Sequence, residues 1–328
     1  MRLRNVLASV TAGLAVVTCL TAVGPAAAGP RACSSRVAVD GYSDVLDKTE
    51  FQGTFVGNLS ALAVDRHGRV AALSDRSALF TLDAQTYAPR TVVPLADESG
   101  AQLDSEGLVV ERDGSRLVSS ESEPSVRRYA SDGTLLGSLP VPPVLRVAPG
   151  GRAGRNLTFE GLTLQPGGRT LVAAMEGALA GDGAGIVRLQ TWRRYGPAHD
   201  FRLSAQYGYR ADTGLGISEA TATGDGRLLV LERGFTAGTG NTVRLYLTDL
   251  RRATDVGSVQ YLDGSSRLVR KTLLADIADC PSLGAPAKQP QPNPLLDNIE
   301  ALAVTSHAPG GRLRLLLASD DNQNATRI

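Results

Sequence analysis

The chain has few of the residues that common metal-binding and membrane motifs require. Only three of its 328 residues are His and three are Cys, and neither an H-E-x-x-H nor a C-x-x-C spacing occurs. A zincin helix and a cysteine zinc site are therefore excluded. Beyond residue 28 no apolar run approaches the ~18 residues that cross a bilayer, so no stable membrane insertion is expected. A formal net charge of +1 argues against nucleic acid as a partner.

The N-terminus has the pattern of a secretory signal peptide. Arg2 and Arg4 precede an apolar stretch over residues 6–23, and Ala26 to Ala28 offer a small-residue cleavage site. We therefore predict a signal peptide over residues 1–28, cleavage near Ala28, and a secreted mature chain over residues 29–328. A membrane anchor is the alternative reading of the same stretch. Loss of the two arginines takes the formal net charge from +1 to −1.

Two cysteines, Cys33 and Cys280, remain in the predicted mature chain. An even cysteine count in an exported protein suggests one disulfide. That bond would tie the N-terminal segment to a late, proline-rich loop. Two unpaired thiols are the alternative.

A hairpin pattern with acidic residues at its ends occurs five times along the chain. Each copy has a short alternating run, a turn with glycine and a second apolar run, which predicts an antiparallel strand pair. The copies open at Ser60, Glu106, Glu160, Glu219 and Glu300 and close at Asp75, Glu121, Glu176, Glu232 and Asp320. The opening and closing residues of a hairpin lie at the same end. Five hairpins around one axis would therefore bring these acids together on one rim.

The spacing of the hairpins predicts the fold class. Helical periodicity is weak throughout, and the module starts recur at about 50 residues, the length of a four-stranded propeller blade. The longer last interval leaves room for one more blade or for a large insertion. We predict an all-β, single-domain β-propeller, with six blades. Residues 37–55 are expected to supply a strand that closes the ring with the C-terminus.

Several of these modules resemble one family of secreted bacterial proteins, the phytase-like family with the esterase-like activity of phytase. The resemblance covers roughly residue 37 to the C-terminus and rests on DSEGL at 104–108, NLTFEGL at 156–162, RLLVLERGF at 227–235, and NIEAL at 298–302 with SDDN at 319–322. It implies a β-propeller and hydrolysis of phosphate or other esters. The chain departs from the pattern at Ser60, where an acid is expected, and in the short segment after Asn322.

The acidic residues suit a Ca²⁺ site, because hard cations prefer carboxylate, amide and carbonyl oxygens. Close carboxylates repel one another unless a cation or an arginine lies between them. We predict that the metal ligands come from Glu106, Glu160, Glu219, Glu300 and Asp320. The alternative is that these acids cap strand ends and pair with arginines.

The predicted activity is Ca²⁺-dependent hydrolysis of a small anionic ester, phytate-like substrates included, by a monomer. Glu160 and Glu232 are the predicted catalytic residues. Arg76 and Arg233, each directly after a closing acid, are predicted to bind the anion, because arginine binds phosphate through two hydrogen bonds. A lactonase or carboxylesterase is a related alternative. A non-catalytic binding propeller with structural Ca²⁺ is the alternative from a different class.

Overall fold

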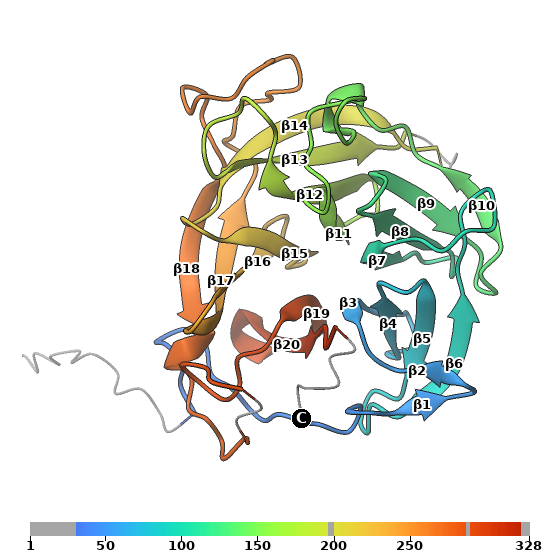
Figure 1. The fold of residues 1–328 in the computed structure, drawn as a ribbon, viewed down its shortest axis with the longest axis vertical. Coiled ribbons are helices and arrows are strands. Elements are labelled where there is room, and N and C mark those ends of the chain that lie inside the picture. The colour runs from blue at the N-terminus through green and yellow to red at the C-terminus, as the bar shows by residue number, and fades with distance from the viewer. Residues whose placement is uncertain (1–30, 196–199, 287–288, 323–328) are drawn as a thin grey trace, which may run out of the picture.

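The computed structural model describes residues 31–195, 200–286 and 289–322, and these residues form an all-β fold (Figure 1). The predicted signal peptide lies outside the described residues. Apart from strands there are three short 3₁₀ segments, η1 (Pro143–Leu145), η2 (Ile277–Asp279) and η3 (Pro309–Gly311). Among the described residues, no helix is long and apolar enough to cross a membrane.

Four antiparallel sheets of four strands follow one another along the chain. The first contains β3 (Leu59–Val64), β4 (Val70–Ser74), β5 (Ala78–Leu82) and β6 (Pro89–Pro94). The second contains β7 (Ser105–Val110), β8 (Arg116–Ser120), β9 (Ser125–Tyr129) and β10 (Leu135–Ser138). The third contains β11 (Phe159–Leu164), β12 (Thr170–Ala178), β13 (Ile186–Arg193) and β14 (Arg202–Arg210). The fourth contains β15 (Gly216–Ala222), β16 (Leu228–Thr236), β17 (Gly240–Asp249) and β18 (Arg270–Asp276).

A fifth sheet has two strands, β19 (Ile299–Ala308) and β20 (Arg312–Ser319). The first strands of the five sheets, β3, β7, β11, β15 and β19, surround one axis, and the later strands of each sheet lie farther out (Figure 1). Strand β19 contacts both β15 and β3, so the ring of inner strands is closed. The predicted β-propeller is therefore confirmed.

The predicted count of six blades is wrong. The described residues form four four-stranded blades and the two-stranded fifth sheet. The long interval between the fourth and fifth hairpins, read as a sixth blade, instead holds β17, β18 and two irregular loops. Spacing alone could not separate these possibilities, because a long insertion and an extra blade lengthen the interval equally.

The strand expected from residues 37–55 is not formed as predicted. Within the described chain, β1 (Glu50–Phe51) and β2 (Thr54–Phe55) pair only with each other. The segment closes the ring by packing instead, since Phe51 and Val56 join an apolar cluster that contains Phe80 of β5 and Ala301 of β19. Hydrophobic contact, and not a shared sheet, thus links the N-terminal segment to both sides of the closure.

The core lies between neighbouring blades. Phe159 and Trp192 of the third sheet pack against Leu117 and Val126 of the second, with the two aromatic rings edge to face. Trp192 is fully buried and its indole N–H donates to the carbonyl of Pro140 at 2.7 Å. Such burial of large apolar side chains is the main stabilising contribution to a fold of this kind.

The predicted disulfide between Cys33 and Cys280 is confirmed. It lies in a small apolar cluster with Ala275 of β18 and Val37. Ser34 adds a hydrogen bond from its hydroxyl to the carbonyl of Leu274 at 2.6 Å. The disulfide and this hydrogen bond together hold the N-terminal segment against the outer strand of the fourth blade and the turn that follows it.

Removing this disulfide is expected to cause a large loss of stability. The two cysteines are 247 residues apart, and the chain-entropy model assigns about 4–5 kcal/mol to closing so long a loop. The double substitution Cys33→Ala with Cys280→Ala should lower the free energy of unfolding in urea by an amount near that value. The reduced wild-type protein is the matched comparison. An unfolding midpoint unchanged by both treatments would contradict the expectation.

Candidate functional site

The five inner hairpins share one register, which brings equivalent residues to one end of the ring. Each opens with a pair of facing residues followed by a β-bulge. These pairs are Leu59 with Ser74, Ser105 with Ser120, Phe159 with Met175, Ile217 with Glu232, and Ile299 with Ser319. The residues directly after the first members are Ser60, Glu106, Glu160, Ser218 and Glu300. Those directly after the second members are Asp75, Glu121, Glu176, Arg233 and Asp320.

A repeated backbone hydrogen bond supports this equivalence. The N–H of the closing residue donates to the carbonyl two residues before the opening one, at 2.6–3.0 Å in four sheets. The donors and acceptors are Asp75 with Asn58, Glu121 with Asp104, Glu176 with Thr158, and Asp320 with Asn298. In the fourth sheet Arg233 faces the corresponding residue, Gly216. The first, second, third and fifth sheets thus each present acidic side chains at the same end.

Two groups of carboxylates are close enough to share a cation. Asp104, Glu106 and Glu121 form one group, and Glu121, Glu160 and Glu176 form the other, with oxygens within 4.8 Å of one another in each. Glu121 belongs to both. Glu106, Glu121 and Glu160 are buried. The two groups therefore form one continuous acidic centre across the second and third sheets.

The fifth sheet extends this centre and the fourth contributes a cation. The amide nitrogen of Asn298 donates to Glu300 at 3.0 Å and to Asp320 at 3.2 Å. Arg233 Nη2 lies 2.9 Å from Glu300 Oε1 and 3.7 Å from Glu176 Oε1. A single guanidinium thus joins the third and fifth sheets across the position where the fourth has no acid.

Burial and mutual repulsion raise the pKa of the carboxyl groups in this centre. The pKa values of Glu106 and Glu160 are well above the usual range, first because of burial and then because of neighbouring carboxylates. The same causes raise the pKa of Glu121 to about 7. Burial, partly opposed by Arg233, raises the pKa of Glu300 to about 8. These acids cannot all be charged at neutral pH unless a cation compensates them.

The donor set fits a hard divalent cation. Carboxylate and amide oxygens are the ligands that Ca²⁺ prefers. Asn58 is buried at this end of the first sheet, and its Oδ1 accepts no hydrogen bond within the described part of the chain. The nitrogen of the same amide donates to Asp75 at 3.4 Å. A buried polar atom without a partner is costly, so the unpaired Oδ1 suits a role as an additional ligand. The oxygen donors of these residues are therefore of the kind that the predicted Ca²⁺ needs.

In the fourth sheet, the two acids expected at the shared end of the hairpins are each one residue away from the positions that face it. Ser218 and Arg233 occupy the ring positions, whereas Glu219 and Glu232 are each displaced from them by one place. A shift of one residue turns a strand side chain to the opposite face. Glu219 Oε1 accepts hydrogen bonds from the N–H groups of Ala220 at 2.7 Å and Leu162 at 3.3 Å. It belongs to neither acidic group.

Glu232, a predicted catalytic residue, lies in a separate buried network. It accepts hydrogen bonds from the hydroxyl of Tyr209, from Lys271 Nζ and, at 2.7 Å, from the N–H of Asp212. Lys271 also binds the carboxylate of Asp212 at 2.7 Å and lies over the ring of Tyr246. These contacts anchor the loop between β14 and β15.

Substitution of Glu232 by Gln is therefore expected to reduce stability and not metal binding. Breaking one partner of a buried, hydrogen-bonded ion pair costs about 3 kcal/mol. The free energy of unfolding in urea should fall by roughly that amount, while calorimetric titration with Ca²⁺ should give an unchanged affinity. Loss of Ca²⁺ affinity with normal stability would instead place Glu232 in the acidic centre.

The remaining predicted residues lie in or beside the centre. Glu106 and Glu160 belong to the carboxylate groups, and Glu300 and Asp320 lie next to them. Arg76 is largely exposed and its Nε lies 3.5 Å from Asp75. The predicted ligand set omitted Asp104, Glu121 and Glu176 of the two carboxylate groups. Glu121 and Glu176 are closing acids of their hairpins in the sequence pattern, and the place of Asp104 two residues before Glu106 on an extended segment puts both side chains on one face.

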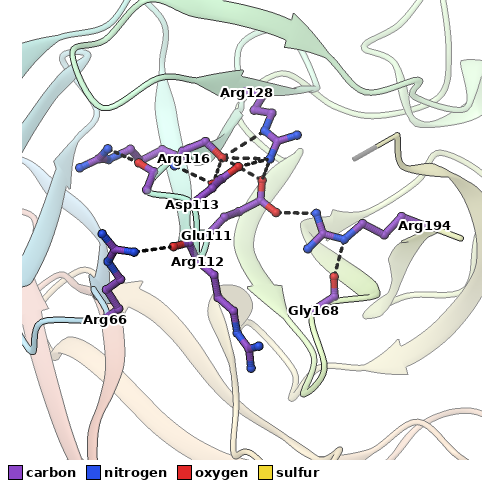
Figure 2. A network of polar contacts seen from close by, with 10 residues as sticks. Arg66, Glu111, Arg112, Asp113, Arg116, Arg128, Gly168 and Arg194 are labelled. Carbon is purple, nitrogen blue, oxygen red and sulfur yellow. Dashed lines mark hydrogen bonds and ion pairs between the residues drawn. The ribbon is translucent and has the colours of Figure 1, made fainter. Parts of the chain in front are cut away.

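Acids at the opposite end of the blades show the contrasting arrangement. Figure 2 shows Glu111, just after β7, between two arginines. Its carboxylate lies 2.6 Å from Arg128 and 2.7 Å from Arg194. Glu111 is thus neutralised by arginines within the protein. With Asp75 of the first sheet, the acidic centre comprises eight carboxylates, those of Asp75, Asp104, Glu106, Glu121, Glu160, Glu176, Glu300 and Asp320. Among the described residues, only Arg76 and Arg233 form ion pairs with them.

Comparison with known proteins identifies the family of this chain. The model of the phytase-like family, described as esterase-like activity of phytase, matches residues 54–323. No curated protein matches the chain. Among solved structures, it is similar to the β-propeller domain of Cps50 (Swd1) from Myceliophteria thermophila. That similarity has a TM-score of 0.36 and 10% identity, over 75% of this chain and 76% of the other, which is too low to carry a functional argument. The family match spans most of the chain, and the protein therefore belongs to the phytase-like family.

Proposed function

We propose that this protein is a secreted, Ca²⁺-dependent hydrolase of phosphate esters. The observation that carries the proposal is the acidic centre with Arg233 at one end of the propeller. Membership of the phytase-like family supports a hydrolase. The Cys33–Cys280 disulfide fits an extracellular protein, since such bonds persist in oxidising compartments. Secretion itself rests on the predicted signal peptide.

The two carboxylate groups are the proposed metal ligands. Asp104 and Glu106 would hold a cation on one side of Glu121, and Glu160 and Glu176 on the other. A bound divalent cation polarises a phosphoryl oxygen and lowers the pKa of bound water. Burial and mutual repulsion raise the pKa values of Glu106 and Glu160, and a bound cation would offset both effects, which supports their role as ligands.

The chain's own groups would position the ester and move protons. Arg233 is the proposed anion-binding residue, because its guanidinium borders the carboxylates and arginine matches phosphate geometry. Glu300 contacts Arg233 and belongs to neither carboxylate group, so it is the proposed acid that donates a proton to the leaving oxygen. Glu176 lies beside Arg233 through its Oε1, so in addition to its place among the proposed ligands it is the proposed base that orients the attacking water.

Calcium titration combined with hydrolysis assays tests the proposal. The mature protein, stripped with EDTA, should bind Ca²⁺ in a calorimeter and should hydrolyse p-nitrophenyl phosphate only after Ca²⁺ is restored. Glu160→Gln should weaken Ca²⁺ binding at least tenfold and remove turnover, because it takes one charge from a buried ligand group. Glu50→Gln, an exposed site on β1, is the matched control and should change neither.

The outcomes separate the proposed function from its alternatives. Turnover of p-nitrophenyl acetate without the phosphate would assign a carboxylesterase. Ca²⁺ binding that raises the melting temperature without turnover of either ester would favour a binding propeller. No Ca²⁺ binding at all would overturn the metal site.

A further inference from the structure

A pocket adjoins the acidic centre between the third and fourth blades. It has a volume of about 550 Å³, within the usual range of small-ligand pockets. Glu176 and Arg233, which form part of the acidic centre, line one side of it. A ligand in this pocket would therefore reach the proposed reacting groups at one end.

Part of the pocket lining is apolar. It includes Phe235, Leu157 and Leu215. Phe235 is 58% exposed and Leu157 41% exposed, so two of the large apolar side chains that remain open to solvent border the same pocket. Exposed apolar groups gathered at a concave site are typical of ligand-binding surfaces.

Two glycines of the pocket lining allow neighbouring groups to approach closely. An added Cβ at Gly234 would lie 2.5 Å from the carbonyl oxygen of Gly214, and one at Gly216 would lie 2.9 Å from the side chain of Glu176. The loop that carries Gly214 is anchored by Asp212, whose carboxylate is bound by Arg244 and Lys271. The pocket is therefore built on a fixed loop and backbone walls.

Two arginines that line the pocket have hydrogen-bond donors without a partner in the part of the chain that the structure describes. Arg233 Nε is buried and has no hydrogen-bond partner in the described residues. Arg210 donates to the carbonyl of Ala184 at 3.4 Å and, within the same residues, has no carboxylate partner. Unused guanidinium donors beside an apolar wall favour a ligand with one anionic end.

We propose that the substrate is a small ester with a single anionic group and an apolar moiety, such as an aryl or alkyl phosphate. The anionic end would lie at Arg233 and the apolar part against Phe235 and Leu157. This inference rests on the proposed function for the reaction and adds the substrate class. A polyphosphorylated, fully polar substrate is disfavoured, because the pocket has an apolar wall and adjoins eight carboxylates.

Binding of phosphonates, which resist hydrolysis, tests the inference without turnover. Calorimetric titration of the Ca²⁺-loaded protein should show phenylphosphonate binding at least tenfold more tightly than methylphosphonate and than the methylenephosphonate analogue of glucose 1-phosphate, which is polar. Phe235→Ser should weaken phenylphosphonate about tenfold and leave methylphosphonate unchanged. Leu136→Ser, at an equally exposed apolar site on β10, is the matched control and should have no effect.

Each result decides one question. Equal affinity for phenylphosphonate and methylphosphonate, tighter binding of the polar glucose analogue, or a phenyl preference that survives Phe235→Ser would overturn the substrate class. Selective binding of phenylphosphonate by a protein that turns over no ester would support the pocket and overturn the proposed hydrolase. Arg233→Gln should weaken the binding of both phosphonates, and that result would show that the anionic group of the ligand lies at Arg233.

Discussion

Replacing Glu121 by Gln is expected to weaken Ca²⁺ binding more than any other single substitution in the acidic centre. Glu121 is the one residue shared by the two carboxylate groups, so its loss removes a ligand charge from both. Affinity of oxygen-ligand sites depends on the number of charged ligands, and a loss of at least tenfold is expected. The metal-free protein should become more stable, because repulsion of Glu121 by Glu176 and Asp104 disappears. Calorimetric titration and urea unfolding in EDTA measure the two effects.

Glu111→Gln is the matched control. Glu111 is as buried as Glu121, but Arg128 and Arg194 already neutralise it (Figure 2). Its substitution should leave Ca²⁺ affinity unchanged and lower the free energy of unfolding by about 3 kcal/mol, the cost of breaking a buried ion pair. The two glutamates should thus respond with opposite signs in stability. If Glu121→Gln instead destabilised the metal-free protein and left Ca²⁺ binding intact, the acidic centre would be a structural network.

The metal-free protein is expected to lose stability as the pH rises from 5 to 8. The folded-state pKa values of Asp75, Glu121 and Glu300 are raised to about 6, 7 and 8. At any pH between the ordinary carboxyl pKa values and these raised ones, the folded protein holds more protons than the unfolded chain. The stabilising contribution is therefore complete below about pH 4 and is lost as the pH passes through 6 to 8. For Glu121 alone the loss is on the order of 3 kcal/mol.

Calcium should remove most of this pH dependence. A bound cation replaces the protons that the folded carboxylates otherwise need, so stability in excess Ca²⁺ should vary little over the same range. Urea unfolding at half-unit pH steps, with EDTA and with Ca²⁺, measures both profiles. If the stability of the metal-free protein instead rose from pH 5 to 8, the negative charges of the acidic centre would already be neutralised by groups of the protein itself.

The local features of the chain could be predicted because they depend on short-range patterns. Alternating runs joined by glycine turns indicated the hairpins, and their ends at Glu106, Glu160 and Glu300 indicated where the acids would meet. The acids of one hairpin share an end by chain geometry alone, and only closure of the ring was needed to bring the hairpins together. The disulfide followed from cysteine count, since two cysteines allow one pairing.

The number of blades and the use of the fourth sheet depended on tertiary structure. A long interval in the sequence is equally compatible with an extra blade and with the loops that flank β18. Glu219 and Glu232 fit the acidic pattern by spacing, but the register of β15 with β16 places Ser218 and Arg233 in the ring. Register is set by packing of whole sheet faces, which a motif match does not represent.

The sequence by itself determined the all-β class, the repeated hairpins, the acidic character of their shared end and the cysteine pair. Each of these depends on residue type and on spacing within one hairpin or on a simple count. Tertiary structure alone decided that the fourth blade contributes a guanidinium where the other sheets contribute acids. It also decided that a pocket with an apolar wall opens beside that guanidinium. Both depend on side chains from different blades meeting across the ring, and that contact is a property of the packed fold.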